Sequence, residues 1–363
     1  MSEKNRVLFF DDAEQFGGGP LAMSGIMTHF GGERVLLRRF ACGEEESRYP
    51  AEIILRLPHF SYPRHLSSPV TQLFFLPKLI FYIATILWML RRMRPHLVFA
   101  NTLLSLIPLA ICAKVWGARL VWCAHSSDIP NNRSLRRLVK QAKLVLCVSE
   151  VVRDRVAALD SCIPTLIVHN SAEAKGDNLP KALPGDIRLG YVGRLSEEKG
   201  LDVLLRAMAQ LDQRFVLTLV GDGPERHRLI QLSQELGIAE QVNFVGMKSE
   251  LLPYYLGFDF LCLTSPQEGN PLVVIEALNA GIPVIATPSE ALVRVFGDLS
   301  PVHLAADFSP ESVAKMISAC AGQKRPEEQE FHRARQRFSR AAQRKALQRE
   351  FEAWLAPQSS NRS

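Results

Sequence analysis

Residues 258–287 read FDFLCLTSPQEGNPLVVIEALNAGIPVIAT, and this stretch decides the fold class. A short apolar run ends at Leu263, a polar loop follows it, and a second apolar run covers Pro271–Ala280. Proline is favoured at the first position of a helix and asparagine at its cap, so we expect a helix here with Asn270 as its cap. A further apolar run at Pro283–Ala286 completes a strand–helix–strand unit, the building block of a parallel sheet.

The same alternation extends over most of the chain and indicates parallel sheets covered by helices. Residues 171–186 interrupt it with two prolines and two glycines and no apolar period, as a linker does. We therefore expect two doubly wound, Rossmann-like α/β domains whose parallel sheets face each other across a cleft, where ligands bind such sheets. The expected parts are an N-terminal domain at 1–170, a linker at 171–186, a second domain at 187–335 and a C-terminal helix at 336–356.

The expected strands and helices follow from the apolar runs and their spacing. Strands are expected at 6–10, 53–57, 96–101, 120–125, 144–149 and 165–168, and then at 188–192, 216–220, 242–245, 258–263 and 283–286. Helices are expected at 21–30, 71–92, 104–116, 151–159, 201–211, 225–236, 249–256, 271–280 and 310–321, with a helical tail at 324–355.

Composition narrows the class of protein further. The chain has 363 residues, of which 47% are apolar and 22% charged, so a disordered or collagen-like chain is excluded. Its seven cysteines are an odd number without a Cys-x-x-Cys pair, which favours neither a zinc cluster nor a disulfide framework. The N-terminus reaches two aspartates too early for a signal peptide, so we expect a cytoplasmic protein.

The positive charge is concentrated in the first half of the chain. The first 180 residues hold 22 Lys and Arg against 15 Asp and Glu, and no acidic residue lies between Glu52 and Asp128. This pattern indicates an anionic partner: a membrane surface, a nucleic acid or an acidic substrate. Within it, Leu73–Leu90 is apolar but carries Pro77 and Lys78, so we interpret it as a core helix that either touches the membrane interface or is simply buried.

Two carboxylates in the opening stretch are candidates for ligand binding. Glu276 stands in a helix that is otherwise apolar, and a buried carboxylate needs hydrogen-bond donors, which a ribose diol would supply. Glu268 lies in the loop before this helix, at the cleft, where it would bind sugar hydroxyls. Taken alone, Glu268 is better explained by an interaction with the helix dipole, and Glu276 by an ion pair with a lysine or arginine. The two together in this frame favour a sugar-nucleotide site.

A second candidate segment is GYVGRLSEEKG at residues 190–200. Arg194 follows a strand, and Lys199 stands where the next helix begins. Cations at a helix N-terminus are unfavourable unless an anion lies between them and the dipole, so the pair indicates a phosphate or diphosphate site. The alternative is a surface lysine paired with Glu197 or Glu198.

The N-terminal domain offers a glycine-rich loop and a histidine. Gly17, Gly18 and Gly19 precede a helix, where backbone N–H groups approach phosphates closely; they match a dinucleotide fingerprint only loosely, and a flexible turn is the alternative. His125 ends a strand, so it is expected to face the cleft, although a lone histidine is more often structural.

Together these segments resemble the retaining glycosyltransferases of family 4, which have the GT-B fold. The resemblance spans nearly the whole chain and rests on Gly17–Gly19, His125, GRLSEEKG at 193–200, GDGPE at 221–225 and the Glu268/Glu276 pair. It implies that Arg194 and Lys199 hold the donor diphosphate, that Glu276 binds the ribose and Glu268 the donor sugar, and that His125 contacts the sugar near the reacting carbon. The implied catalytic residues are His125, Arg194, Lys199 and Glu268; the implied donor-binding residues are Gly17, Gly18, Gly19, Arg194, Lys199, Gly269, Asn270, Leu272 and Glu276.

The expected activity is retaining transfer of a sugar from a nucleotide diphosphate sugar, a UDP-sugar by preference, to a hydroxyl of a glycan or lipid-linked acceptor of the cell envelope. We expect no cofactor, no metal and no nucleic-acid partner. We do expect the protein to lie at the periphery of the cytoplasmic membrane. Asn270-Pro271 depart from the Phe-Gly that the family often has, which leaves the donor sugar open. The alternatives are a nucleotide-sugar epimerase or hydrolase of the same fold, and a dinucleotide-dependent oxidoreductase built on the glycine loop.

Overall fold

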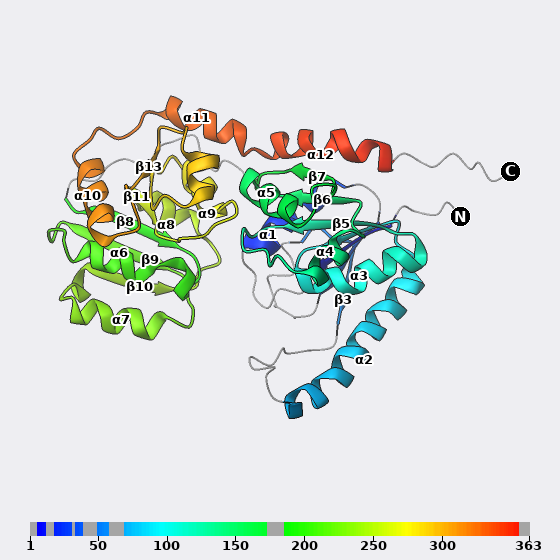
Figure 1. The fold of residues 1–363 in the computed structure, drawn as a ribbon. Coiled ribbons are helices and arrows are strands. Elements are labelled where there is room, and N and C mark those ends of the chain that lie inside the picture. Colours follow the sequence, from blue (N-terminus) through cyan, green and yellow to red (C-terminus); the bar gives the residue numbers. More distant parts are fainter. Residues whose placement is uncertain are drawn as a thin grey trace.

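Two parallel sheets with helices on both faces lie side by side, and two consecutive C-terminal helices run along one side of both (Figure 1). The computed structural model describes residues 6–11, 18–30, 33–38, 49–57, 69–172 and 185–355. Residues 173–184 of the expected linker, Gly17 of the glycine loop and Cys42 lie outside these ranges. In the part of the chain that is described, no helix combines the length and the apolar character that crossing a bilayer requires.

The first sheet has the strand order β3-β2-β1-β4-β5-β6-β7 within the described residues, and every pair is parallel. Its strands are β1 (Arg6–Asp11), β2 (Glu33–Arg38), β3 (Ile53–Arg56), β4 (Leu97–Ala100), β5 (Arg119–Ala124), β6 (Leu144–Cys147) and β7 (Thr165–Ile167). Its helices are α1 (Gly18–Met27), α2 (Pro69–Met93), α3 (Leu103–Trp116), α4 (Arg133–Val139) and α5 (Glu150–Leu159). The order reverses between β1 and β4, which is where such sheets place ligands.

The second sheet has the order β10-β9-β8-β11-β12-β13 in the described ranges and is also parallel. Its strands are β8 (Ile187–Val192), β9 (Phe215–Val220), β10 (Val242–Gly246), β11 (Phe260–Leu263), β12 (Val284–Ala286) and β13 (Val302–Leu304). Its α-helices are α6 (Leu201–Met208), α7 (Arg226–Glu235), α8 (Leu252–Leu256), α9 (Leu272–Asn279) and α10 (Pro310–Ala321). The reversal between β8 and β11 brings the loops of residues 193–200 and 264–271 side by side.

The C-terminal tail crosses back to the first domain. Helix α11 (Glu328–Arg337) packs on α9, and α12 (Arg340–Leu355) lies along the first domain (Figure 1). The Phe351 ring packs against Phe30 and Phe99, with centroids 5.1 and 5.9 Å away. Helices α1 and α12 thus cover one face of the first sheet, and α2 to α5 pack on the other.

The two doubly wound domains expected from the sequence are confirmed, with element ends shifted by up to four residues, and the helical tail expected at 324–355 is divided into α11 and α12. Strands β2 and β13 and helix α4 are not predicted. Strand β2 reads ERVLLR, whose charges hide the apolar run, and β13 has only three residues. Helix α4 reads RSLRRLV and buries only Leu135 and Val139, too little for a clear period.

Candidate active site

The loops that follow β8 and β11 are bound to each other. Thr264 Oγ1 donates hydrogen bonds to the carbonyl oxygens of Gly200, at 2.8 Å, and of Lys199, at 3.3 Å. Gly200 has φ +61°, and a Cβ there would fall 2.5 Å from the Thr264 carbonyl oxygen. Only glycine fits this approach, because the contact is backbone against backbone. The two predicted segments therefore form one structural unit at the carboxyl edge of the sheet.

Lys199 and Glu268 meet in this unit. The Lys199 ammonium lies 2.8 Å from Glu268 Oε1, and the side chains are 27% and 10% exposed. The sequence offered Glu197 or Glu198 as the alternative partner of Lys199, and the structure gives it Glu268 instead, 69 residues away. An ammonium has three N–H donors, so this contact leaves donors of Lys199 for a further anion.

Arg194 lies on the same loop with an exposed side chain. Among the described residues its guanidinium makes no hydrogen bond or ion pair, so the structure does not bring it into contact with the other predicted site residues. Nearby, the Glu198 carboxylate accepts a hydrogen bond from Ser196 at 2.5 Å. That bond, with the charges of Arg194 and Lys199, lowers the pKa of Glu198. The positive charge of the loop is thus partly offset by its own carboxylate.

Glu276 is half-buried on α9 and accepts a hydrogen bond from the Tyr255 hydroxyl at 2.7 Å. Burial and the Glu276 charge raise the pKa of Tyr255 well above its ordinary value, so the phenol stays a donor. The expected carboxylate is half-buried rather than buried, and its hydrogen-bond donor is a tyrosine that the sequence analysis did not single out.

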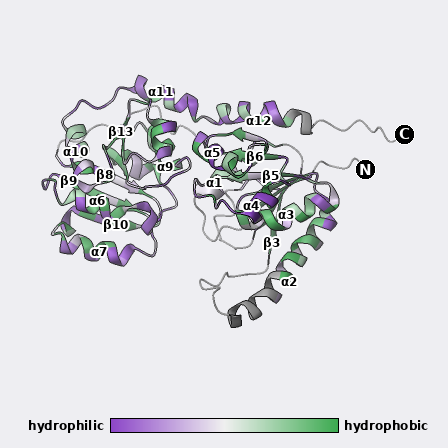
Figure 2. Cartoon of the chain, viewed as in Figure 1, coloured by the Kyte–Doolittle hydropathy of each residue, from purple (hydrophilic) through white to green (hydrophobic). Residues whose placement is uncertain are grey.

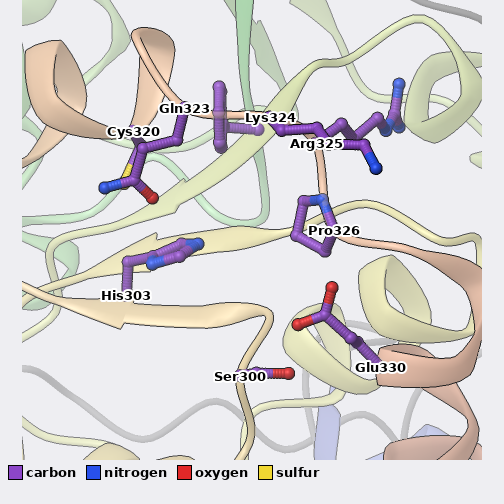
Figure 3. A pocket seen from close by; sticks show the side chains of 9 residues that line it. Ser300, His303, Cys320, Gln323, Lys324, Arg325, Pro326 and Glu330 are labelled. Carbon is purple, nitrogen blue, oxygen red and sulfur yellow. The ribbon is translucent and has the colours of Figure 1, made fainter.

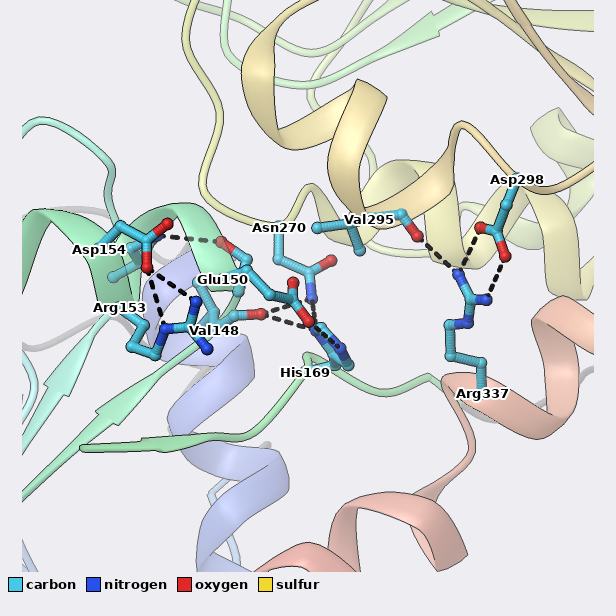
Figure 4. A network of polar contacts seen from close by, with 11 residues as sticks. Val148, Glu150, Arg153, Asp154, His169, Asn270, Val295, Asp298 and Arg337 are labelled. Carbon is cyan, nitrogen blue, oxygen red and sulfur yellow. Dashed lines mark hydrogen bonds and ion pairs between the residues drawn. The ribbon is translucent and has the colours of Figure 1, made fainter.

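Asn270 joins the two domains instead of capping α9. Its Nδ2 donates to the carbonyl of Val148 at 2.9 Å, and its own carbonyl accepts from Asn170 Nδ2 at 2.7 Å. Figure 4 shows Asn270 reaching toward His169 and Val148 from the opposite domain. The expected cap is wrong: α9 starts at Leu272 with Pro271 as N-cap and no side-chain hydrogen bond. These bonds use the side-chain nitrogen and the backbone carbonyl of Asn270, whereas its Oδ1, the atom that a cap would use, has no hydrogen-bond partner within the described residues.

A further contact between the two domains joins Gly269 to His125. A Cβ on Gly269 would fall 2.2 Å from the His125 carbonyl oxygen, so the second-domain loop touches the first-domain backbone. Both ring nitrogens of His125 are buried without a hydrogen-bond partner in the described part of the chain. Burial lowers the pKa of His125 to about 4, so the ring is neutral near pH 7 and holds one donor and one acceptor nitrogen.

The glycine loop is described only from Gly18 onward, where α1 begins. A Cβ on Gly19 would lie 3.9 Å from His125 Cδ2 and from Asn101 Nδ2. Asn101 directly follows β4 and is 5% exposed; its Nδ2 donates to Asp11 Oδ1 at 3.0 Å. The start of α1 therefore lies against the carboxyl edge of the first sheet, beside the predicted histidine.

The comparisons with protein families decide what this arrangement belongs to. Residues 35–171 match the family described as Glycosyltransferase Family 4, and residues 180–344 match Glycosyl transferases group 1. The chain belongs to the family 4 glycosyltransferases. The resemblance drawn from the motifs is thereby confirmed, and it covers both domains.

This family 4 chain has the same fold as several solved structures. The Anabaena protein HepE, solved in complex with UDP-glucose, superposes with a TM-score of 0.77 over 96% of this chain and 99% of HepE, at 21% identity. The GT-B fold expected from the resemblance is thus confirmed. The likeness at this identity concerns the fold.

Curated relatives are similar over shorter segments. An alpha-monoglucosyldiacylglycerol synthase of Streptococcus pneumoniae is 32% identical over 173 residues, which is 42% of this chain and 39% of that protein. The lipopolysaccharide core biosynthesis glycosyltransferase LpsE of Rhizobium meliloti is 35% identical over 99 residues, or 27% of this chain and 29% of LpsE. The chain spans less than half the length of these relatives.

Several residues of the cleft were missed by sequence reasoning. Asp11 ends β1 and Asn101 directly follows the neighbouring β4, at the point where the strand order reverses, and polar residues at such positions are the signal that could have found them. Tyr255 and His169 had no such signal. His169 donates from Nδ1 to the Val148 carbonyl at 3.0 Å, which is the carbonyl that Asn270 also uses.

A pocket of about 220 Å³ lies elsewhere in the second domain. Phe260 starts β11 and Ser300 precedes β13, so the pocket opens at the amino ends of the strands, away from the predicted site. Its lining side chains include His303, Cys320, Lys324 and Glu330 (Figure 3). None of the predicted site residues lines it.

Proposed function

We propose that this chain transfers a sugar from a nucleotide diphosphate sugar to a hydroxyl group, with retention of the anomeric configuration. The observation that carries the proposal is the unit formed by the loops after β8 and β11, in which Lys199 meets Glu268. Arg194 shares the first loop, and α9, which carries Glu276, follows the second. The unit lies where α/β sheets of this kind bind ligands, and the family membership supports its use for nucleotide sugars.

The donor we propose is a UDP-sugar. Arg194 and the remaining N–H groups of Lys199 would bind the diphosphate, and the Gly18 and Gly19 amides at the start of α1 would face it from the other domain. Glu276, with one site taken by Tyr255, would accept hydrogen bonds from the ribose diol. HepE, which shares the fold, was solved with UDP-glucose, and this supports the choice of UDP.

The proposed chemistry follows from where charge develops. The transition state is oxocarbenium-like, and negative charge builds on the departing diphosphate, which Arg194 and Lys199 would stabilise. Glu268 would hold sugar hydroxyls while it fixes the Lys199 ammonium, and neutral His125 would hydrogen-bond the sugar. The leaving phosphate would accept the proton of the acceptor hydroxyl on the same face. This route uses no cofactor besides the donor and no metal ion.

The acceptor we propose is a glycan or lipid-linked hydroxyl of cell-envelope polysaccharide or lipopolysaccharide synthesis, bound by the N-terminal domain on the cytoplasmic side of the membrane. The names of the relatives that act in lipopolysaccharide core and glycolipid synthesis support this class. So does the excess of positive charge in the first 180 residues, because a lipopolysaccharide acceptor and the anionic lipids around a lipid acceptor carry phosphates.

The test is product analysis with UDP-glucose, UDP-galactose and GDP-mannose as donors, and with diacylglycerol or deacylated lipopolysaccharide core as acceptors. We expect one donor to give a product whose α-linkage NMR can identify. Turnover should be lost in Lys199→Ala and kept in Lys324→Ala, because Lys324 forms a lysine–glutamate pair on the surface. A β-linked product would contradict retention. Release of free sugar, or its epimer, equally fast without acceptor would instead make the chain a hydrolase or an epimerase.

A further inference from the structure

Helix α2 is apolar on both its inner and outer faces. Tyr82, Ile86 and Leu90 are buried against the first domain. On the opposite side, Phe81 and Trp88 are 66% and 60% exposed. Of the two interpretations of this segment, the simply buried helix is therefore wrong for this face. A helix that is apolar all round is ordinarily covered on all sides, so the outer face of α2 lacks a partner within the described chain.

Helix α3 continues this exposed apolar surface. It packs against α2 on the same face of the first sheet, and Val115 is 61% exposed near its carboxyl end. Both helices lead into neighbouring parallel strands, so they run in the same direction and their carboxyl ends lie at the same edge of the sheet. We call the surface formed by Ile80, Phe81, Trp88, Ile111, Val115 and Trp116 the α2–α3 face.

The charges around the α2–α3 face are all positive. Arg91 and Arg92 end α2 and are exposed, and Lys114 is exposed on α3. The Arg92 guanidinium lies 6.0 Å from the centre of the Trp88 ring. Figure 2 shows hydrophobic colour along the described part of α2 and hydrophilic colour at its carboxyl end. Residues 53–127, which include both helices, contain no Asp or Glu, and within the described residues Arg91, Arg92 and Lys114 form no ion pair.

This combination of chemistry selects one occupant. A twofold dimer through the α2–α3 face would place the same arginines of both copies in one interface, which like-charge repulsion disfavours. The surface of an anionic bilayer offers acyl chains for Phe81 and Trp88 and phosphates for Arg91 and Arg92. Aromatic side chains beside arginine and lysine are typical of helices that lie in the membrane interface.

We propose that the α2–α3 face binds the surface of a bilayer that contains anionic lipids. The aromatic rings of Phe81 and Trp88 enter the headgroup region, and Arg91, Arg92 and Lys114 contact lipid phosphates. This binding does not use the cleft residues, so it goes beyond the proposed function. It would hold the N-terminal domain against the membrane, where a lipid-linked acceptor is presented.

The test is sedimentation of the full chain with vesicles of phosphatidylcholine plus phosphatidylglycerol, compared with phosphatidylcholine alone. We expect binding to the anionic vesicles that weakens about 30-fold in Arg91→Glu/Arg92→Ala and at least about tenfold in Phe81→Ser/Trp88→Ser. The matched controls are Arg206→Glu and Phe308→Ser, exposed residues of the second domain, which should sediment like wild type.

Three outcomes would overturn the proposal. The wild type could fail to bind anionic vesicles, or the variants of the α2–α3 face could bind them as tightly as the wild type does. The third is that the wild type is a dimer and that Phe81→Ser/Trp88→Ser dissociates it. Binding of UDP by each variant, measured by calorimetry, keeps this test apart from the proposed function. The variants should bind UDP as wild type does, which also shows that they are folded.

Discussion

The Lys199 ammonium lies 2.8 Å from Glu268 Oε1 and so joins the loops after β8 and β11 by an ion pair that is mostly shielded from water. The pair fixes a cation at the carboxyl edge of the second sheet, and Gly269, next to Glu268, touches the backbone of His125 in the first domain. One short segment thus connects the candidate phosphate site, the candidate sugar site and the domain interface.

Replacing Lys199 by alanine should lower kcat by a factor of ~10²–10³, because one group that stabilises the departing diphosphate is lost. Steady-state kinetics with the donor that product analysis identifies measures this effect. Lys324→Ala removes a lysine that also pairs with a glutamate but lies on the surface, and it should keep wild-type kcat. A Lys199→Ala enzyme with wild-type turnover would remove Lys199 from the mechanism.

Glu276→Gln should weaken UDP binding about 10- to 100-fold, since a charge-assisted hydrogen bond to the ribose becomes a neutral one. Tyr255→Phe removes the hydroxyl that donates to Glu276 but keeps the carboxylate, so its Kd should rise less than tenfold. Calorimetric titration with UDP compares the two. Equal affinities of Glu276→Gln and wild type would show that Glu276 does not bind the nucleotide.

His125 should make the fold less stable as the pH falls. Its pKa is lowered from 6.5 to about 4 in the folded chain, so between these values the unfolded chain binds a proton that the folded chain does not. The free energy of unfolding should therefore decline as the pH falls from about 6.5 toward 4. Urea denaturation across this range measures the slope of the free energy of unfolding against pH. In His125→Asn this slope should be smaller by the contribution of one proton. An NMR titration that places the His125 pKa near 6.5 would contradict this account.

Gly269→Ala should disrupt the domain interface, because the new Cβ would fall 2.2 Å from a backbone oxygen that cannot rotate away. We expect a loss of stability of about 1–3 kcal/mol and at least a tenfold loss of kcat. Gly322→Ala is the matched control, since a Cβ there would lie 3.7 Å from its nearest neighbour, Ala319. If both variants behave like wild type, the contact between Gly269 and His125 is not needed for activity.

The sequence predicts the architecture well because residues 258–287 and the similar units around them have clear periods. It fails where charge masks an apolar run, as in β2, or where few residues are buried, as in α4. The candidate site residues were singled out because they stand in local motifs. Their partners lie far along the chain: Lys199 from Glu268, Glu276 from Tyr255 and Asn270 from Val148. Local patterns carry no information about such pairs.

Asn270 is a case in which the local pattern made a wrong prediction. Its position before Pro271 and an apolar run fits a helix cap, and a single segment offers no competing partner. In the folded chain the Nδ2 of Asn270 donates to Val148 and its backbone carbonyl accepts from Asn170, both in the other domain, and α9 begins at Leu272 without a side-chain cap.

The central claim is that the unit around Lys199 and Glu268 binds a nucleotide diphosphate sugar. Thermal unfolding with UDP-glucose, GDP-mannose and ADP-glucose tests it most directly, because a ligand at a hundred times its Kd stabilises the folded chain by about 2.7 kcal/mol. We predict that UDP-glucose raises the Tm of wild type and raises it much less in Arg194→Ala/Lys199→Ala. No shift of wild type with any of the three ligands, or the same shift in the double variant, would contradict the claim.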